Sequence, residues 1–127
     1  MGMFCYQCQE TAGNRGCTTR GVCGKSDTTA SLQDLLIYVL RGISLYGIEL
    51  AGRGTPDEAA GRFVAEALFV TVTNVNFDDE NIMDYIGRAL NERDRLAELA
   101  GPVEDSTGAA SWKPAGEADY MSTAVNV

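Results

Sequence analysis

Four cysteines near the start of the chain are the residues most able to do chemistry. They are Cys5, Cys8, Cys17 and Cys23, in the spacing C-x2-C-x8-C-x5-C. The rest of the 127-residue chain contains no other cysteine and no histidine. Thiolates ligate zinc and iron–sulfur clusters, and pairs of thiols form disulfides. We therefore expect one of these three chemistries in the N-terminal segment.

Disulfides and zinc are two of the three interpretations. Disulfides are typical of small secreted proteins, and nothing in the sequence indicates secretion. A structural zinc site needs four tetrahedral ligands, often arranged as two C-x2-C pairs. Only Cys5 and Cys8 have that spacing. All-cysteine zinc sites vary in spacing, so zinc stays open as an interpretation.

An iron–sulfur cluster is the third interpretation, and it needs four thiolates held by a flexible loop. The glycines of this segment admit left-handed backbone and let backbone N–H groups approach the sulfurs. Nearby positive charge from Arg15, Arg20 or Lys25 would stabilise an anionic cluster and tune its potential. The residue chemistry alone favours the cluster slightly over zinc.

Charge is unevenly distributed along the chain. The net charge of -8 argues against nucleic acid as a partner, because phosphate binding needs Lys and Arg. Residues 1–25 nevertheless carry a net charge of +2, with Glu10 as their one acidic residue, and the remainder carries -10. This distribution is consistent with compensation for a buried thiolate site.

The sequence gives no indication of export or of a membrane. No run of about 18 apolar residues is present, so a membrane span is not expected. The N-terminus lacks the basic and then apolar pattern of a signal peptide. We therefore expect a cytoplasmic protein.

Three zones are visible along a chain whose length predicts one domain. Residues 1–27 form a glycine-rich loop, residues 28–101 carry helical periodicity, and residues 102–127 form a tail poor in large apolar residues. Short connections favour antiparallel neighbours. The expected fold is mainly α, with the cysteine loop packed on an antiparallel three-helix bundle.

Three helices are predicted within residues 28–101. The first runs from about Thr29 to Ala51, with a capping signal at Ser31 or at the two preceding threonines. The second has Thr55 as its N-cap, followed by Pro56, and the third runs from about Asp79 to Ala100. The residues expected to face the core are Leu32, Leu35, Leu36, Val39, Leu40, Ile43, Tyr46, Ile48, Ala59, Phe63, Ala67, Leu68, Val70, Ile82, Tyr85, Ile86, Ala89, Leu90, Leu96 and Leu99.

Two further features of these helices bear on packing. Gly42 and Gly47 weaken the first helix, and they leave room for close approach of another element. The β-branched stretch "FVTVTNVNF" at residues 69–77 has no strand partner in the sequence, so we expect a frayed helix end followed by a loop.

The segment "MFCYQCQETAGNRGCTTRGVCGK" closely resembles the N-terminus of the hybrid-cluster proteins, also called prismane proteins or hydroxylamine reductases. The likeness continues through "LQDLLIYVLRGIS" and into "LFVTVTNVNFDDENI". The resemblance implies that Cys5, Cys8, Cys17 and Cys23 ligate an iron–sulfur cluster. Their spacing is that of the family's short-spaced form, which carries a [4Fe–4S] cubane. It also implies a helical first domain.

The resemblance covers a small part of the family's length. Members are several times longer, and Cys, His and Glu residues of later domains hold their substrate-reducing hybrid cluster. This chain has no histidine and no fifth cysteine, so we expect that site to be absent and assign no catalytic residue. The chain resembles about the first half of the family's helical domain, either encoded separately or truncated.

The resemblance implies an oxidoreductase of the hydroxylamine reductase type. In the family this cluster passes electrons towards the hybrid cluster, where hydroxylamine or nitric oxide is reduced. The chain alone is expected to act as an electron-transfer module. Two alternatives stay open, namely a zinc-loaded four-cysteine binding or assembly module and one subunit of a split hydroxylamine or nitric oxide reductase.

The expected partners follow from this interpretation. An electron carrier needs a redox partner protein. An apolar face left open would favour self-association or a larger complementary chain. No nucleic acid and no membrane are expected.

Overall fold

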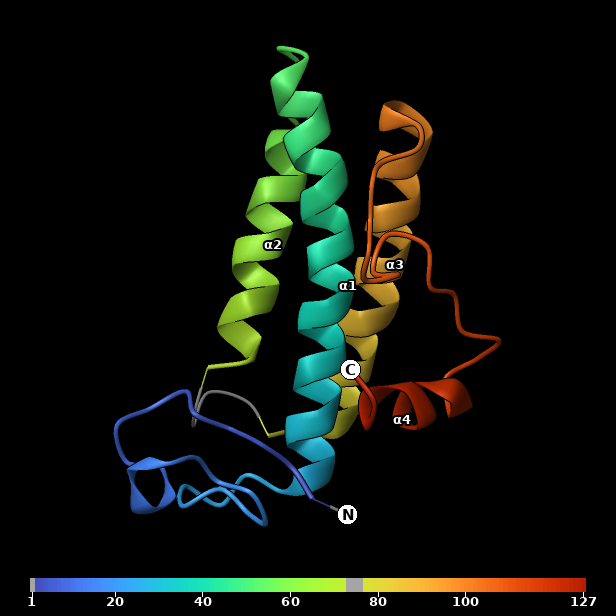
Figure 1. Cartoon of the computed structure of the whole chain (residues 1–127). Helices are drawn as coiled ribbons and strands as arrows, with labels where there is room; N and C mark the ends of the chain where they lie inside the picture. The colour runs from blue at the N-terminus through green and yellow to red at the C-terminus, as the bar shows by residue number, and fades with distance from the viewer. Residues whose placement is uncertain (1, 73–76) are drawn as a thin grey trace.

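The computed structural model describes residues 2–72 and 77–127, and within them the chain is mainly helical with no strand (Figure 1). Three long helices run alternately up and down, so that neighbours in sequence are antiparallel. This confirms the predicted mainly α fold. The elements are a short 3-10 turn η1 (Ala12–Asn14), α1 (Asp27–Gly52), α2 (Glu58–Val70), α3 (Asp79–Ala100) and α4 (Ala118–Ala124).

Helix α1 is the central element, and its apolar stripe packs mainly against α3. Leu35, Leu36 and Val39 are fully buried on that stripe. The helix begins earlier than predicted, because the Ser26 hydroxyl accepts the N-terminal hydrogen bond from the Thr29 amide. The predicted cap at Ser31 was therefore wrong.

Helix α2 begins at Glu58, because the Asp57 carboxylate caps it by accepting from the Ala60 amide at 2.9 Å. Thr55 was predicted as this cap. Its hydroxyl instead donates to the Leu50 carbonyl at the end of α1. Pro56 lies before the helix and not within it.

Asp78 is the N-cap of helix α3. The apolar face of this helix, which includes Ile82, Ile86 and Leu96, packs against α1. It ends at Gly101, which has a φ of 74° that favours glycine.

The core lies between these helices and largely matches the predicted set. Four predicted members are exposed instead, because helical spacing alone does not define the edges of a buried face. They are Ile48, Ala59, Leu68 and Leu99. Phe63, Tyr85 and Leu90 pack partly buried against the core.

The segment after α3 returns across the bundle and ends in α4, which packs against α1 (Figure 1). The sequence did not indicate α4. Buried Arg93 fixes the returning segment by donating to the carbonyls of Ala109 and Trp112. Gly42 of α1 lies under this segment, and a Cβ there would overlap the Ala109 carbonyl. The expected close approach at Gly42 is thus confirmed, whereas a Cβ at Gly47 would meet nothing.

Two remaining predictions concern the β-branched stretch at residues 69–77 and the absence of a membrane span. Of the stretch 69–77, α2 ends at Val70 and residues 71–72 and 77 form no strand, while residues 73–76 lie outside the described residues. Helix α1 is long and apolar enough to cross a membrane by length and composition alone. Core helices pass the same test, and the apolar stripe of α1 packs against α3.

Candidate functional site

The four cysteines lie in the loop that precedes α1, at one end of the helical bundle (Figure 1). The first described residues run across this end, and the loop then turns back towards the start of α1. All four cysteines are free thiols, so the disulfide interpretation has no counterpart in the structure.

Backbone pairing places two of the cysteines side by side. Cys5 and Cys17 form an isolated antiparallel bridge, in which each amide donates to the other's carbonyl at 3.0 and 2.9 Å. A third hydrogen bond, from the Met3 amide to the Thr18 carbonyl, extends the pairing. Residues directly opposite each other in such a pair have side chains on the same face. The loop therefore presents the Cys5 and Cys17 thiols on a common side.

Gly16 allows this pairing to form under an aromatic ring. Its φ of 116° lies in the region that favours glycine, and a Cβ there would overlap the ring of Phe4. Phe4 is itself 60% exposed, so its ring covers Gly16 on one face and meets solvent on the other.

Cys17 is the most buried of the four thiols and has the most hydrogen-bond donors. The Ala12 amide donates to its Sγ at 3.4 Å, and the Thr11 hydroxyl lies 3.6 Å from the same atom. Hydrogen bonds from the Ala12 and Val22 amides, and then from Thr11, hold the pKa of Cys17 below its usual value, while desolvation opposes them. The loop thus stabilises a thiolate at this position, which is the form that binds metals.

Lys25 is the one of the three predicted loop cations that the fold distinguishes from Arg15 and Arg20. Only 1% of it is exposed, although lysine is almost never fully buried without a partner. Its Nζ donates to the Cys5 Sγ at 3.6 Å and to the Gln7 Oε1 at 3.0 Å. Arg15 and Arg20, the other two cations of the loop, are exposed.

Cys8 and Cys23 are partly buried in the same loop. Cys23 lies in the turn closed by the hydrogen bond from the Gly24 amide to the Gly21 carbonyl. The Cys23 Sγ would be 3.1 Å from a Cβ at Gly21, which explains why glycine suits that position. Across residues 2–72 and 77–127, no group of three or more His, Cys, Asp or Glu side chains is close enough to hold one metal ion. The structure therefore pairs the backbones of two of the predicted ligands, Cys5 and Cys17, and the described residues form no ready-made site for a single metal ion.

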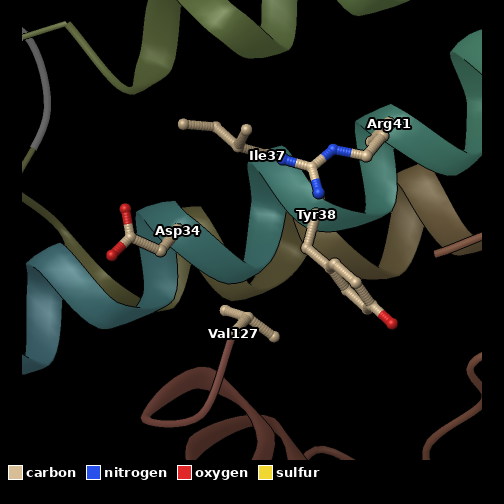
Figure 2. Close-up of a pocket in the computed structure, with 5 residues that line it drawn as sticks. All are labelled: Asp34, Ile37, Tyr38, Arg41 and Val127. Carbon is tan, nitrogen blue, oxygen red and sulfur yellow. The ribbon is translucent and has the colours of Figure 1, made fainter. Parts of the chain in front are cut away.

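Two cavities lie along the side of α1 that faces the loop and the C-terminus. A cavity of about 250 Å³ is lined by Cys5, Lys25 and Asp34, among others. A second one, of about 220 Å³, shares Asp34 and extends to Tyr38, Arg41 and Val127 (Figure 2). Desolvation raises the pKa of Asp34, and the Lys25 charge opposes this.

Comparison with known proteins places these features in a family. Residues 3–125 match the Prismane/CO dehydrogenase family, and this range includes all four cysteines. The chain is similar to a hydroxylamine reductase of Desulfosudis oleivorans, with 47% identity over 98% of this chain and 23% of the relative. It is also similar to hydroxylamine reductases of Petrotoga mobilis (46% identity, 100% of this chain, 26% of the relative) and Nitratidesulfovibrio vulgaris (54%, 74% and 17%).

The match covers a small part of each relative, because the chain spans about a quarter or less of their length. On this chain's side the match extends from the cysteine loop through all four helices almost to the last residue. The chain belongs to the Prismane/CO dehydrogenase family.

Proposed function

We propose that the N-terminal loop holds a [4Fe–4S] cluster on Cys5, Cys8, Cys17 and Cys23, and that the chain acts as an electron-transfer module. The observation that carries the proposal is the loop itself, in which four free thiols lie within 19 residues and backbone amides stabilise the Cys17 thiolate. Such a cluster accepts one electron from a reduced partner protein and passes one electron on.

The protein residues have separate tasks in this proposal. The bridge between Cys5 and Cys17 fixes two ligands against each other. The Ala12 amide and the Thr11 hydroxyl donate towards one of the sulfurs, and such hydrogen bonds favour the anionic state. Phe4 and Tyr6 flank the first ligand in sequence and line the same cavity as Cys5, although both aromatic side chains are largely exposed.

The donor set fits the cluster chemically, because four thiolates are the usual ligands of a cubane. The support is the donor chemistry of the four free thiols and the family membership. A zinc ion would use the same thiolates. Zinc is therefore the outcome that the experiment has to distinguish.

Electron counting tests the proposal. The anaerobically reconstituted chain is titrated with dithionite while its visible absorbance is followed. We expect a brown protein that takes up about one electron per chain and recovers its colour on reoxidation. A chain that binds metal but remains colourless and takes up no electrons would contradict the proposal and would favour the zinc-loaded module.

The relatives suggest a second candidate, in which this chain supplies the electron-transfer part of a larger hydroxylamine reductase. The relatives carry that name and are about four or more times longer than the matched segment. Co-purification with a larger Cys- and His-bearing chain, together with hydroxylamine-dependent oxidation of a reduced dye, would support this candidate. Loss of the dye reaction when that chain is removed would place catalysis in the larger chain.

An open groove lies between α1 and α2. It has a volume of about 380 Å³ and is lined mainly by small and apolar residues, including Gly47, Ala51 and Gly61. Exposed Ile48 borders it, and Phe69 near the end of α2 is also exposed. We propose that the groove receives a helix from the remaining part of a hydroxylamine reductase-type protein, and that it supports self-association without that part.

A further inference from the structure

Lys25 has an environment that its position in a loop does not explain. It is one of two lysines in the chain, and the other, Lys113, is exposed between α3 and α4. Burying an ammonium group is costly unless a negative or strongly polar partner compensates it. The side chain of Lys25 is nevertheless almost completely inside the protein, at 1% exposure.

The contacts of Lys25 show which groups compensate it. Within the described part of the chain, no carboxylate forms an ion pair with its Nζ. The ammonium instead donates to the Cys5 sulfur and to the Gln7 side-chain carbonyl. The amide oxygen is neutral, so the sulfur is the one of these two acceptors that can carry a full negative charge.

The backbone holds the lysine in this position. The Gly21 amide donates to the Lys25 carbonyl at 2.8 Å, which closes the turn that carries Cys23. A Cβ on Gly21 would lie 2.9 Å from the Lys25 Cβ, so the two residues are packed closely. The side chain thus reaches from the turn of one cysteine to the sulfur of another. The Lys25 charge also lowers the pKa of Cys17, although less than the hydrogen bonds do.

We propose that Lys25 is a positioning residue, whose buried ammonium orients Cys5 and places one fixed positive charge beside the thiolates, so that it raises the reduction potential of the bound cluster. The inference rests on the proposed function and deepens it. A fixed positive charge beside a redox centre favours the more negative, reduced state. Arg15 and Arg20 are solvated, and solvent screens their charges more strongly.

The test compares Lys25→Met with Lys113→Met. Both variants replace a lysine with an apolar chain of similar length and change the net charge equally, so only the position differs. Iron and sulfide are measured first, and the midpoint potential then follows from a redox titration monitored by electron paramagnetic resonance. We expect Lys25→Met to shift the equilibrium between the reduced and the oxidised cluster at least tenfold towards the oxidised state. This shift lowers the midpoint potential by about 59 mV or more. Lys113→Met should leave this equilibrium within threefold of wild type.

The possible failures are distinguishable. A wild-type chain that takes up no iron and sulfide overturns the proposed function, and this inference with it. A loaded wild-type chain with an unchanged potential in Lys25→Met overturns this inference alone. If Lys25→Met does not load, Lys25→Arg decides the matter, because it keeps the charge. Loading restored by arginine supports the role of the charge, and loss of loading in both variants contradicts it.

Discussion

Replacing Gly42 with alanine should destabilise the protein, although the same change in a helix interior ordinarily stabilises by about 1 kcal/mol. Gly42 is buried on the face of α1 that supports the segment between α3 and α4. An added Cβ would overlap the Ala109 carbonyl oxygen and would lie 3.0 Å from the Arg93 Cδ. One obstacle is backbone and the other belongs to a side chain that is 1% exposed, so neither can move freely.

The size of the destabilisation follows from the two groups that the added Cβ would displace. Overpacking a filled site typically costs about 1–3 kcal/mol. The Ala109 carbonyl also accepts a hydrogen bond from the Arg93 Nη1 at 2.9 Å, and a hydrogen bond to a charged group contributes about 1.5–3 kcal/mol. After the gain in helix propensity, we expect Gly42→Ala to lower the free energy of unfolding by about 1.5–5 kcal/mol.

Gly47→Ala is the matched control on the same helix. A Cβ at Gly47 would meet nothing, so we expect this variant to be up to about 1 kcal/mol more stable than wild type. Urea unfolding, followed by circular dichroism at equal metal content, measures both variants. Since m is about 1–3 kcal/mol/M, the midpoint of Gly42→Ala should fall by about 0.5 M or more.

Tryptophan fluorescence reports the same perturbation locally, in addition to the change in overall stability. The only tryptophan, Trp112, accepts a hydrogen bond from Arg93 through its carbonyl and packs partly buried against the core. Its fluorescence should shift to longer wavelength in Gly42→Ala and remain unchanged in Gly47→Ala. A Gly42→Ala protein at least as stable as wild type, with unchanged fluorescence, would refute the close packing of this segment on α1.

Three further predictions test other parts of the structure. Hydrogen bonds from Arg95, and then from the Ala60 amide, lower the pKa of Asp57 to about 2. The ionised carboxylate therefore stabilises the fold above about pH 4, and this contribution is lost as the pH falls towards 2. Asp57→Asn should cost about 1 kcal/mol at pH 7 and much less at pH 2, as measured by urea unfolding; an equal cost at both pH values would contradict this. Cys17→Ser should lose or remodel the cluster, and an unchanged iron content and spectrum would exclude Cys17 as a ligand. Ile48→Glu should reduce self-association in light scattering, while Leu99→Glu, at an exposed position on α3, should not; equal behaviour would argue against the α1–α2 groove.

The sequence predicted the three long helices because their apolar spacing and end signals are strong. Their first residues were less predictable, since Ser26 and Asp57 act as caps where several neighbours have suitable side chains. Helix α4 was missed because residues 102–127 contain few large apolar residues. Tyr120 and Ala124 become buried when α4 packs on the bundle, mainly against α1.

The candidate site was predicted as a set of residues and not as an arrangement. The spacing identified the four cysteines, but it could not show that Cys5 and Cys17 pair through their backbones. The three cations of the loop look equivalent in the sequence. Only the fold places Lys25 inside and leaves Arg15 and Arg20 in solvent. Burial of Arg93 was unpredictable for the same reason, because its partners are backbone carbonyls.

Anaerobic iron and sulfide analysis, joined to an electron paramagnetic resonance spectrum of the reduced chain, tests the cluster assignment most directly. We expect about four iron and about four sulfide ions per chain and the signal of a reduced cubane. One tightly bound zinc ion per chain, without sulfide and without a resonance signal after reduction, would contradict the assignment.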